Sequence, residues 1–435
     1  MDKTYNYHFT PPKGWMNDPN GMIYVNGVYH LFYQHYPHDI VWGPMHWGHA
    51  VSTDLLHWEH KPIAIYPTEE EYIFSGSCVY DKENVSGLGT TEEPPLLAFY
   101  TGHNPVTGEE QQCIAYSTDY ESFTKYEGNP VIQNKKHMPD FKQDFRDPKV
   151  FSNPVSGGFS MVLAAGHQLE FYHSMNLLFW EKTGEFAPKE GFFETCECPD
   201  CFPVETEEGT KWILTLSLTS HVMPYYVGTF NGETFIEDVE DFAKREEQNG
   251  GCSRKQPLLL DYAADNYAMV SFANCKELLL LGWGECWDYA SQTPAKNYRG
   301  KMTMARRAEL VRTGEDWRLK FAPVLGQVVR PESLSMVQTA DEFNLWQGQI
   351  EENETIRILL GNNKELAISV TEEEIIVDRS KGGDFSFSEF LQTKAVRFSA
   401  KRIQRGKSIF TILQDHGYFE IFAEDGLLAF SVMTY

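Results

Sequence analysis

The sequence predicts an all-β protein in which a five-bladed β-propeller is followed by a C-terminal β-sandwich. Three observations support this fold class: short apolar or alternating runs bounded by turn residues, a weak internal repeat, and a denser set of short runs near the C-terminus. Helical periodicity is scarce. With 435 residues, 42% of them hydrophobic, the chain can build one large domain and a smaller one.

The first part of the chain contains strand candidates separated by turn residues. Met22–Val25 and Val28–Tyr33 flank Asn26-Gly27, a pair of residues that favours a tight β-hairpin. Further candidates share the same short apolar or alternating pattern: Leu96–Tyr100, Met161–Ala165, Leu169–Tyr172, Trp212–Ser217, Tyr267–Phe272 and Leu278–Trp283.

An internal repeat indicates how these strands are grouped. The pattern Ser-x-Asp/Asn, followed by an aromatic residue, begins at Ser52, Ser117 and Ser174, so that successive copies are 65 and 57 residues apart. That interval fits one four-stranded blade with its loops. At roughly 60 residues per blade, the sequence predicts about five blades and a propeller domain over residues 1–325.

Residues 336–435 are predicted to form the β-sandwich domain. Arg330-Pro331-Glu332-Ser333 marks a boundary beyond which the repeat does not continue. Seven short strand candidates follow, a density typical of a sandwich. They are Ile356–Leu360, Leu366–Val370, Glu374–Val377, Val396–Ser399, Ile409–Leu413, Tyr418–Phe422 and Leu427–Val432.

Charge and hydropathy limit the partners of the protein. Lys and Arg number 37 against 62 Asp and Glu, and the resulting charge of −25 repels nucleic acid and anionic membranes. We therefore expect a neutral small-molecule substrate. No apolar run approaches the ~18 residues of a membrane span. Residues 1–8 lack the apolar core of a signal peptide, from which a cytoplasmic location is expected. Oligomeric state is left open.

The cysteines do not indicate a disulfide framework or a metal centre. Eight cysteines in a chain of this length suit a reducing compartment. Cys196, Cys198 and Cys201 are clustered, but no second Cys/His pair follows at the spacing of a metal site. We expect neither a metal nor an organic cofactor.

Carboxylate motifs recur at intervals close to the blade period. Asp18 lies in Trp15-Met16-Asn17-Asp18-Pro19-Asn20-Gly21, where Pro, Asn and Gly predict a tight turn. Asp147 lies in Phe145-Arg146-Asp147-Pro148, Glu197 precedes Cys198-Pro199, and Phe74-Ser75 falls between the first two motifs. Positions 18, 75, 147 and 197 are separated by 57, 72 and 50 residues. One blade period returns the chain to the equivalent place, so these motifs should converge at one end of the channel.

Carboxyl groups facing one pocket match glycoside hydrolysis with retention. That reaction needs an ionised carboxylate as nucleophile and a protonated carboxyl as acid, about 5 Å apart. Asp18, beside Asn17, is suited to remain ionised, whereas Glu197 has sequence neighbours that stabilise a charge poorly. Asp147 follows Arg146 and is suited to hold sugar hydroxyls and stabilise positive charge on the ring.

The motifs His8-x-x-Pro11, Met16–Gly21, Arg146-Asp147-Pro148 and Glu197-Cys198-Pro199 together resemble glycoside hydrolase family 32. That family contains invertases, sucrose-6-phosphate hydrolases, inulinases and levanases. The resemblance implies a five-bladed propeller and a sandwich, with Asp18 as nucleophile, Asp147 as transition-state stabiliser and Glu197 as general acid/base. It also implies a set of fructose contacts: Asn17, Gln34, Trp42, Phe74, Ser75, Arg146 and Trp283.

The predicted function is that of a retaining β-fructofuranosidase acting on the terminal fructosyl unit of sucrose or short fructo-oligosaccharides. To bind the phosphate of sucrose-6-phosphate, the protein would need cationic side chains at the rim of the active-site pocket. Lys13, His46, Lys61 and His103 are the candidates. A fructosyltransferase or a levan- or inulin-degrading fructanase would use the same residues. A fructan-binding protein without activity, and a related five-bladed family acting on arabinose or xylose, are the remaining alternatives.

Overall fold

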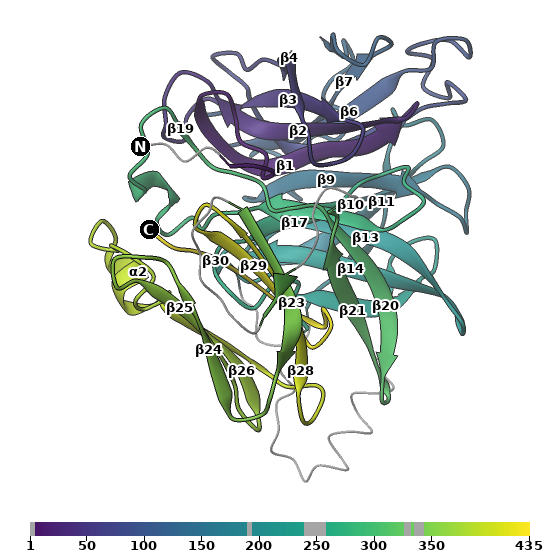
Figure 1. Cartoon of the computed structure of the whole chain (residues 1–435). Coiled ribbons are helices and arrows are strands. Elements are labelled where there is room, and N and C mark those ends of the chain that lie inside the picture. Colours follow the sequence, from purple (N-terminus) through teal and green to yellow (C-terminus); the bar gives the residue numbers. More distant parts are fainter. Residues whose placement is uncertain (1–4, 189–193, 239–257, 326–331, 335–342) are drawn as a thin grey trace. The chain divides into compact units, whose positions relative to one another are not determined.

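The computed structural model describes residues 5–188, 194–238, 258–325, 332–334 and 343–435 (Figure 1). Within these ranges the elements are strands apart from two short helical segments, η1 (Ala290–Gln292) and α2 (Glu389–Thr393). Neither described helix has the length and hydropathy to cross a bilayer. The predicted all-β class is confirmed. Arg330-Pro331, part of the predicted domain boundary, lies outside the described residues.

The chain divides into two compact units, Pro67–Leu259 and the combination of Met1–Tyr66 with Leu260–Tyr435. The unit Pro67–Leu259 contains three antiparallel four-stranded sheets whose strands are ordered as in the chain. One comprises β5 (Tyr72–Tyr80), β6 (Leu96–His103), β7 (Glu110–Ser117) and β8 (Thr124–Lys125). The next comprises β9 (Phe145–Ser152), β10 (Phe159–Ala165), β11 (Gln168–Ser174) and β12 (Glu181–Phe186). The last comprises β13 (Cys196–Thr206), β14 (Gly209–Leu218), β15 (Tyr225–Phe230) and β16 (Phe235–Glu237).

The other unit contains the first and fifth sheets along the chain. The first comprises β1 (Gly14–Val25), β2 (Val28–Tyr36), β3 (His46–Ser52) and β4 (Glu59–Ile65), with the short β19 (Tyr298–Arg299) parallel to β1. The fifth comprises β17 (Tyr267–Ser271), β18 (Leu279–Trp283), β20 (Arg306–Thr313) and β21 (Asp316–Pro323). Because β19 follows the fifth sheet's β18 in sequence yet pairs with β1, it ties these two sheets together.

The same unit holds two further sheets that pack face to face. One comprises β22 (Glu332–Ser333), β23 (Phe343–Ile350), β28 (Ser408–Asp415), β29 (Tyr418–Ala423) and β30 (Leu428–Met433). The other comprises β24 (Glu354–Leu359), β25 (Glu365–Val370), β26 (Glu374–Asp378) and β27 (Arg397–Lys401). A shared apolar core joins them, with Trp346 and Phe410 from the first sheet and Ile368 and Val377 from the second. Their burial makes these sheets a sandwich.

The predicted strands all correspond to observed ones, and the number and order of sheets match a five-bladed propeller followed by a sandwich. The fold class is therefore confirmed. The Asn26-Gly27 hairpin is also confirmed, since both residues have positive φ, 51° and 91°. Among the strands not predicted are β23, several outer blade strands, and β5, β9 and β13, which begin their sheets; polar residues interrupt the apolar pattern in these runs.

The Ser-x-Asp/Asn repeat proves to be a recurrent turn between the third and fourth strands of a blade. In the first copy Ser52 Oγ accepts the N–H of Leu55, while Asp54 accepts the N–H of Leu56 and of His57. Asp119 and Asn176 accept equivalent backbone N–H groups in the second and third copies. The repeat is structural, because its side chains stabilise the turn that starts each fourth strand.

Candidate active site

The first strand of each of the five blade sheets is interrupted, and in β1, β5, β9 and β13 the interruption lies where predicted site residues stand. Register shifts occur between Met16 and Pro19 in β1, Ile73 and Gly76 in β5, Glu197 and Asp200 in β13, and Tyr267 and Val270 in β17. In β9 the shift lies opposite Val162 and Ala164, at Asp147-Pro148. A β-bulge re-aims side chains that regular pairing would place in the sheet.

The bulge corrects one sequence prediction. Asp18 was expected in a tight turn, but it lies inside the twelve-residue strand β1. The turn-forming residues Pro19 and Gly21 interrupt the ladder instead of ending the strand, because the flanking apolar residues are buried on both sides of them. Proline is tolerated here since β1 is irregular at this point.

Asp18 is held by its neighbours within β1. Asn17 Nδ2 donates to Asp18 Oδ1 over 3.0 Å, and Trp15 Nε1 donates to Asn17 Oδ1 over 2.9 Å. Asn17 is buried whereas Asp18 is half-buried, so the carboxylate retains access to solvent. Gln34 Nε2 lies 3.3 Å from Asn20 Oδ1 and places a second amide behind the same bulge. The Asn17 amide therefore donates directly to the Asp18 carboxylate.

Two tryptophans predicted as fructose contacts have different environments. Trp42 is 43% exposed. Trp283 is fully buried, with its ring centroid 6.0 Å from Trp15 and 4.7 Å from Trp287. Trp283 Nε1 has no hydrogen-bond partner among the described residues. Trp283 therefore supports Trp15, and through it the Asn17 amide, from within the core of its unit.

In the other unit, Asp147 and Cys198 occupy strained backbone conformations on adjacent strands. Both have positive φ, 65° for Asp147 and 44° for Cys198, which non-glycine residues seldom adopt. The Cys198 N–H donates to Asp147 Oδ2 over 2.9 Å, and the Asp147 N–H donates to Thr101 Oγ1 over 3.0 Å. The two bulges are thereby locked to each other, and Asp147 receives a backbone donor.

Arg146 connects Glu197 to two further carboxylates. Its Nη2 lies 3.1 Å from Glu197 Oε1, while Nη1 lies 3.2 Å from Glu110 and 2.8 Å from Asp144. Burial opposes the Arg146 charge, but Glu110, Glu197 and Asp147 outweigh it and hold the pKa of the guanidinium well above its usual value. The Glu197 side chain is 21% exposed. We call Arg146, Glu110, Asp144, Asp147 and Glu197 the Arg146 cluster.

Phe74 is joined to the Arg146 cluster through His103. The Phe74 and His103 rings stack with centroids 4.3 Å apart, and His103 Nδ1 lies 3.2 Å from Glu110 Oε1. Burial alone would raise the pKa of Glu110, but the His103 hydrogen bond and the Arg146 charge lower it. Ser75 is buried beside Phe74. Phe74, Arg146, Asp147 and Glu197 thus form one continuous chain of contacts.

Sequence reasoning missed Glu110, Asp144 and Thr101 as members of this site. Glu110 opens β7 without any motif around it, and only its pairing with Arg146 reveals it. His103 was a candidate phosphate contact, but it stacks on Phe74 and pairs with an acid instead. Asp144 could have been suggested by its spacing of two residues from Arg146, which puts both side chains on one face of an extended chain.

The cysteine cluster lies along β13. Cys196 and Cys201 are buried in the apolar core of the unit, and the Cys198 Sγ lies 3.6 Å from Asp147 Oδ2. Cys196 and Cys201 thus face the apolar core, whereas Cys198 faces the Asp147 carboxylate. Lys149 Nζ pairs with Asp200 Oδ2 over 2.9 Å, a buried ion pair that joins β9 to β13.

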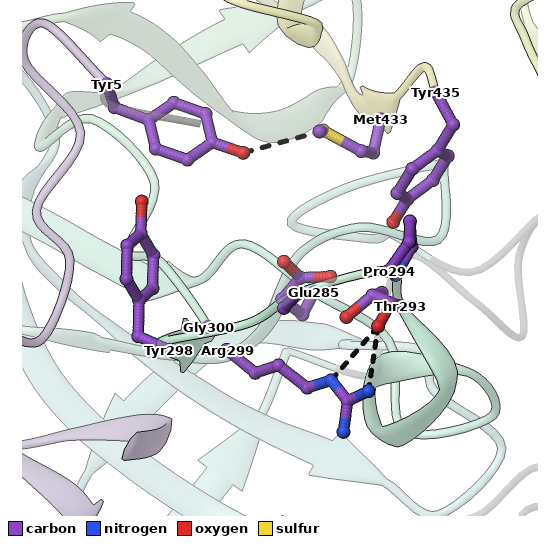
Figure 2. A pocket seen from close by; sticks show the side chains of 10 residues that line it. Tyr5, Glu285, Thr293, Pro294, Tyr298, Arg299, Gly300, Met433 and Tyr435 are labelled. Atoms are coloured by element: carbon purple, nitrogen blue, oxygen red, sulfur yellow. Dashed lines mark hydrogen bonds between the residues drawn. The ribbon is translucent and has the colours of Figure 1, made fainter. Parts of the chain in front are cut away.

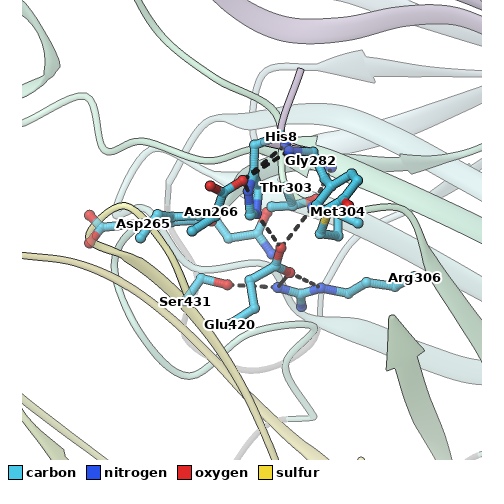
Figure 3. Close-up of polar contacts among 12 residues, drawn as sticks. His8, Asp265, Asn266, Gly282, Thr303, Met304, Arg306, Glu420 and Ser431 are labelled. Carbon is cyan, nitrogen blue, oxygen red and sulfur yellow. Dashed lines mark hydrogen bonds and ion pairs between the residues drawn. The ribbon is translucent and has the colours of Figure 1, made fainter. Parts of the chain in front are cut away.

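His8, the first residue of the resemblance motif, is not among these groups. Its ring lies between Asp415, at 2.8 Å, and Glu420, at 3.0 Å, in a buried network with Arg306 and Ser431 (Figure 3). Arg306 is fully buried and pairs with Glu420 Oε2 at 2.8 Å and Asp261 Oδ2 at 3.1 Å. This Arg306 cluster of His8, Asp261, Arg306, Asp415 and Glu420 joins the N-terminal segment and the fifth blade to the sandwich.

Comparison with known proteins identifies a family for nearly the whole chain. Residues 8–323 match the model of the glycosyl hydrolases family 32 N-terminal domain, and residues 326–435 match that of the glycosyl hydrolases family 32 C-terminal region. A levanase of Bacillus subtilis is 37% identical over 97% of this chain and 64% of its own length. An invertase of Schizosaccharomyces pombe is 38% identical over 70% of this chain and 52% of its own length.

A solved structure agrees with the fold as well. The exo-inulinase of Aspergillus awamori superposes with a TM-score of 0.83 at 28% identity, covering 99% of this chain and 92% of that chain. The chain spans about three fifths of the curated relatives that it matches, 64% for the levanase and 61% for an exo-inulinase of Aspergillus niger.

Proposed function

The chain belongs to glycosyl hydrolase family 32, and on this premise we propose that it is a retaining β-fructofuranosidase. The observation that carries the proposal is the Arg146 cluster, in which a partly exposed Glu197 is held by Arg146 while Asp147 receives the Cys198 N–H. Such an arrangement presents one acid to a leaving group and one fixed carboxylate to a developing positive charge.

In the proposed reaction Asp18 attacks C2 of a β-fructofuranosyl unit and forms a covalent bond with it. Glu197 donates a proton to the departing oxygen, and the C2–O bond breaks. Glu197, now a carboxylate, then takes a proton from water, which attacks C2 and releases Asp18 and fructose with retained configuration. Asp147 stabilises the charge on the ring. Asn17, Gln34, Trp42, Phe74, Ser75 and Arg146 are the proposed sugar contacts, whereas the fully buried Trp283 was expected among them but supports Trp15 from the core.

We propose neutral fructosides as substrates in preference to sucrose-6-phosphate. Among the candidate cations, Lys61 pairs with Glu59 at 2.9 Å and His103 with Glu110 at 3.2 Å. Burial lowers the pKa of His46, which favours its neutral form. These three residues thus offer little positive charge to a phosphate, and the overall charge of −25 adds repulsion.

Fructan degradation is a second candidate, because the similarity to the levanase extends over 97% of the chain. A fructosyltransferase would use the same residues and differ only in the acceptor. A cytoplasmic location remains a prediction; the described cysteines are all free, although the matched exo-inulinases are named extracellular.

The test is fructose release from sucrose, sucrose-6-phosphate, 1-kestose, inulin and levan, with the Asp18→Asn and Glu197→Ala variants run in parallel. Hydrolysis by the wild type that falls by on the order of 10⁴-fold in Asp18→Asn supports the proposal. Transfer products at high sucrose would indicate a transferase. Binding without turnover of any of the five sugars would instead indicate a fructan-binding protein and overturn the proposal.

A further inference from the structure

A pocket lies within the unit formed by Met1–Tyr66 and Leu260–Tyr435. Its cavity volume is about 90 Å³, room for part of a sugar ring and not for a whole disaccharide. Its wall is formed by residues from the N-terminus, from the segment after η1 and from the C-terminus: Tyr5, Glu285, Thr293, Pro294, Ala295, Tyr298, Arg299, Gly300, Met433 and Tyr435 (Figure 2). None of the proposed fructose contacts lines it.

One carboxylate oxygen in this pocket is buried without a partner. The Glu285 side chain is 10% exposed, and its Oε1 accepts from Lys301 Nζ over 2.7 Å. Glu285 Oε2 has no hydrogen-bond partner in the part of the chain that the structure describes. Figure 2 shows the carboxylate facing the space between Tyr5, Tyr298 and Tyr435. An unsatisfied buried carboxylate oxygen is costly, so a donor bound in the pocket would be stabilising.

The charges around the pocket favour a neutral donor. Lys301 is fully buried and already compensates Glu285, so a cationic ligand would meet an excess of positive charge. Arg299 directs Nε and Nη2 to Thr293 O and Nη1 to Ile40 O, at 2.8–3.2 Å. These contacts use the guanidinium for backbone carbonyl groups, so that an anion would find few remaining donors.

Tyrosine side chains supply the rest of the wall. Burial and then the charge of Glu285 raise the pKa of both Tyr5 and Tyr435 well above the usual value, so both phenols stay protonated. The Tyr5 hydroxyl contacts only a weak acceptor, Met433 Sδ, at 3.8 Å in the described contacts. Aromatic faces beside a carboxylate and hydroxyl groups suit a ligand with C–H faces and several O–H groups.

We propose that this pocket is a non-catalytic sugar site, which admits the hydroxyl-bearing edge of one unit of a neutral sugar, where a hydroxyl group donates to Glu285 Oε2. The pocket shares a wall with β1: Gly300 has φ of 98°, and a Cβ there would lie 2.1 Å from Met16 O. Gly300 is consequently unsuitable for a test, because its substitution would disturb the strand that carries Asp18. Ala295, which also lines the pocket, is suitable.

The test is hydrogen–deuterium exchange by mass spectrometry on the Glu197→Gln protein titrated with sucrose, a probe whose choice rests on the proposed function. Glu197→Gln keeps the sugar intact. We expect sucrose to protect the segment 293–300, and Ala295→Trp, which fills the pocket, to raise the apparent Kd of that protection by about tenfold or more. Ser291→Trp adds the same bulk to an exposed position outside the pocket and should change nothing.

The outcomes separate this inference from the proposed function. Protection that persists in Ala295→Trp would place sucrose elsewhere and overturn the non-catalytic sugar site, even if the wild type hydrolyses sucrose. Protection that Ala295→Trp removes would support the non-catalytic sugar site even if no sugar in the panel is hydrolysed. Absence of protection in the segment at any sucrose concentration would also overturn it. Glu285→Gln, which retains the side-chain volume, should weaken the protection as well.

Discussion

The Arg146 cluster and the Arg306 cluster are both built from one arginine shared among several carboxylates, yet they differ in exposure. Arg306 and its partners Asp261 and Glu420 are fully buried, and each has well-placed hydrogen bonds. Arg146 is 15% exposed and Glu197 is 21% exposed. A buried cluster whose charged groups are all hydrogen-bonded can only hold segments together. A cluster that is partly exposed to solvent can exchange a protein contact for a contact with a ligand.

The backbone shows the same difference. Asp147 and Cys198 in the second unit have positive φ, and both contribute to the Arg146 cluster or its contacts. Arg306 lies in the paired strand β20, and Glu420 lies in the middle of β29, opposite Ser431. Strain at Asp147 and Cys198, and regular pairing at Arg306 and Glu420, are consistent with a site in the Arg146 cluster and a joint in the Arg306 cluster.

The largest effect on activity should come from Glu197, the acid in the Arg146 cluster. Glu197→Gln retains the shape of the side chain but cannot donate and accept a proton as a carboxyl group does. Loss of general acid/base catalysis should lower kcat by about 10²–10⁴-fold. The melting temperature should be nearly unchanged, since Glu197 is partly exposed. Steady-state kinetics measures kcat, and calorimetry measures the melting temperature. Full activity in the variant would exclude Glu197 as the acid.

Arg306→Lys should have the next largest effect, on stability. Lysine cannot reach Asp261, Glu420 and Ser431 together, so buried charges lose partners at a cost of about 3–5 kcal/mol. Urea unfolding measures this loss. The folded fraction should retain its kcat. An Arg307→Lys variant, at the neighbouring 40% exposed position, is the matched control and should be close to neutral. A stable Arg306→Lys protein would contradict the assigned role.

The same substitution in the Arg146 cluster should have the opposite result, with a larger effect on activity than on stability. Arg146→Lys retains a charge but loses the fork that reaches Glu110, Asp144 and Glu197. We expect kcat/KM to fall by about 10²-fold, because a misplaced acid loses alignment. Stability should fall less than in Arg306→Lys. If unfolding showed an equal or greater loss for Arg146→Lys, the distinction between the two clusters would be wrong.

The smallest effect concerns pH. Burial opposes the charge of His8, but hydrogen bonds to Asp415 and Glu420 raise the pKa of His8 in the folded protein. A raised pKa stabilises the fold at pH values below the usual histidine pKa of about 6.5, and this contribution is lost as the pH rises through the folded pKa. The melting temperature should therefore decline on the alkaline side.

Asp415, the carboxylate partner of His8, determines how stability changes at acidic pH. Despite burial, the His8 hydrogen bond lowers the pKa of Asp415 to about 2. Its contribution is present above the usual aspartate pKa of about 4 and is lost as the pH falls toward about 2. His8→Gln should flatten the alkaline decline in calorimetric scans from pH 6 upward. His57→Gln, which removes an exposed histidine paired with Asp54, should leave the decline in place.

Much of the fold was predictable from the sequence. Asn26-Gly27 predicted a hairpin because both positions need positive φ, and the Ser-x-Asp/Asn repeat gave the blade interval because its side chains build the same turn each time. The motifs of Asp18, Asp147 and Glu197 could be found because their carboxylates recur at intervals close to the blade period and because they resemble the motifs of one family. Their exact backbone form could not, and Asp18 proved to lie in a bulge.

The sequence by itself determined the all-β class, the order of the sheets and the family, because periodicity, turn chemistry and short motifs are local properties of the chain. Only the tertiary structure decided which charged residues face one another. Glu110 and Arg146 are 36 residues apart, and His8 and Glu420 are 412 apart. Such pairs have no local signal, because strand pairing and packing bring them together. The same packing leaves Glu285 Oε2 unpaired and Glu197 within reach of solvent.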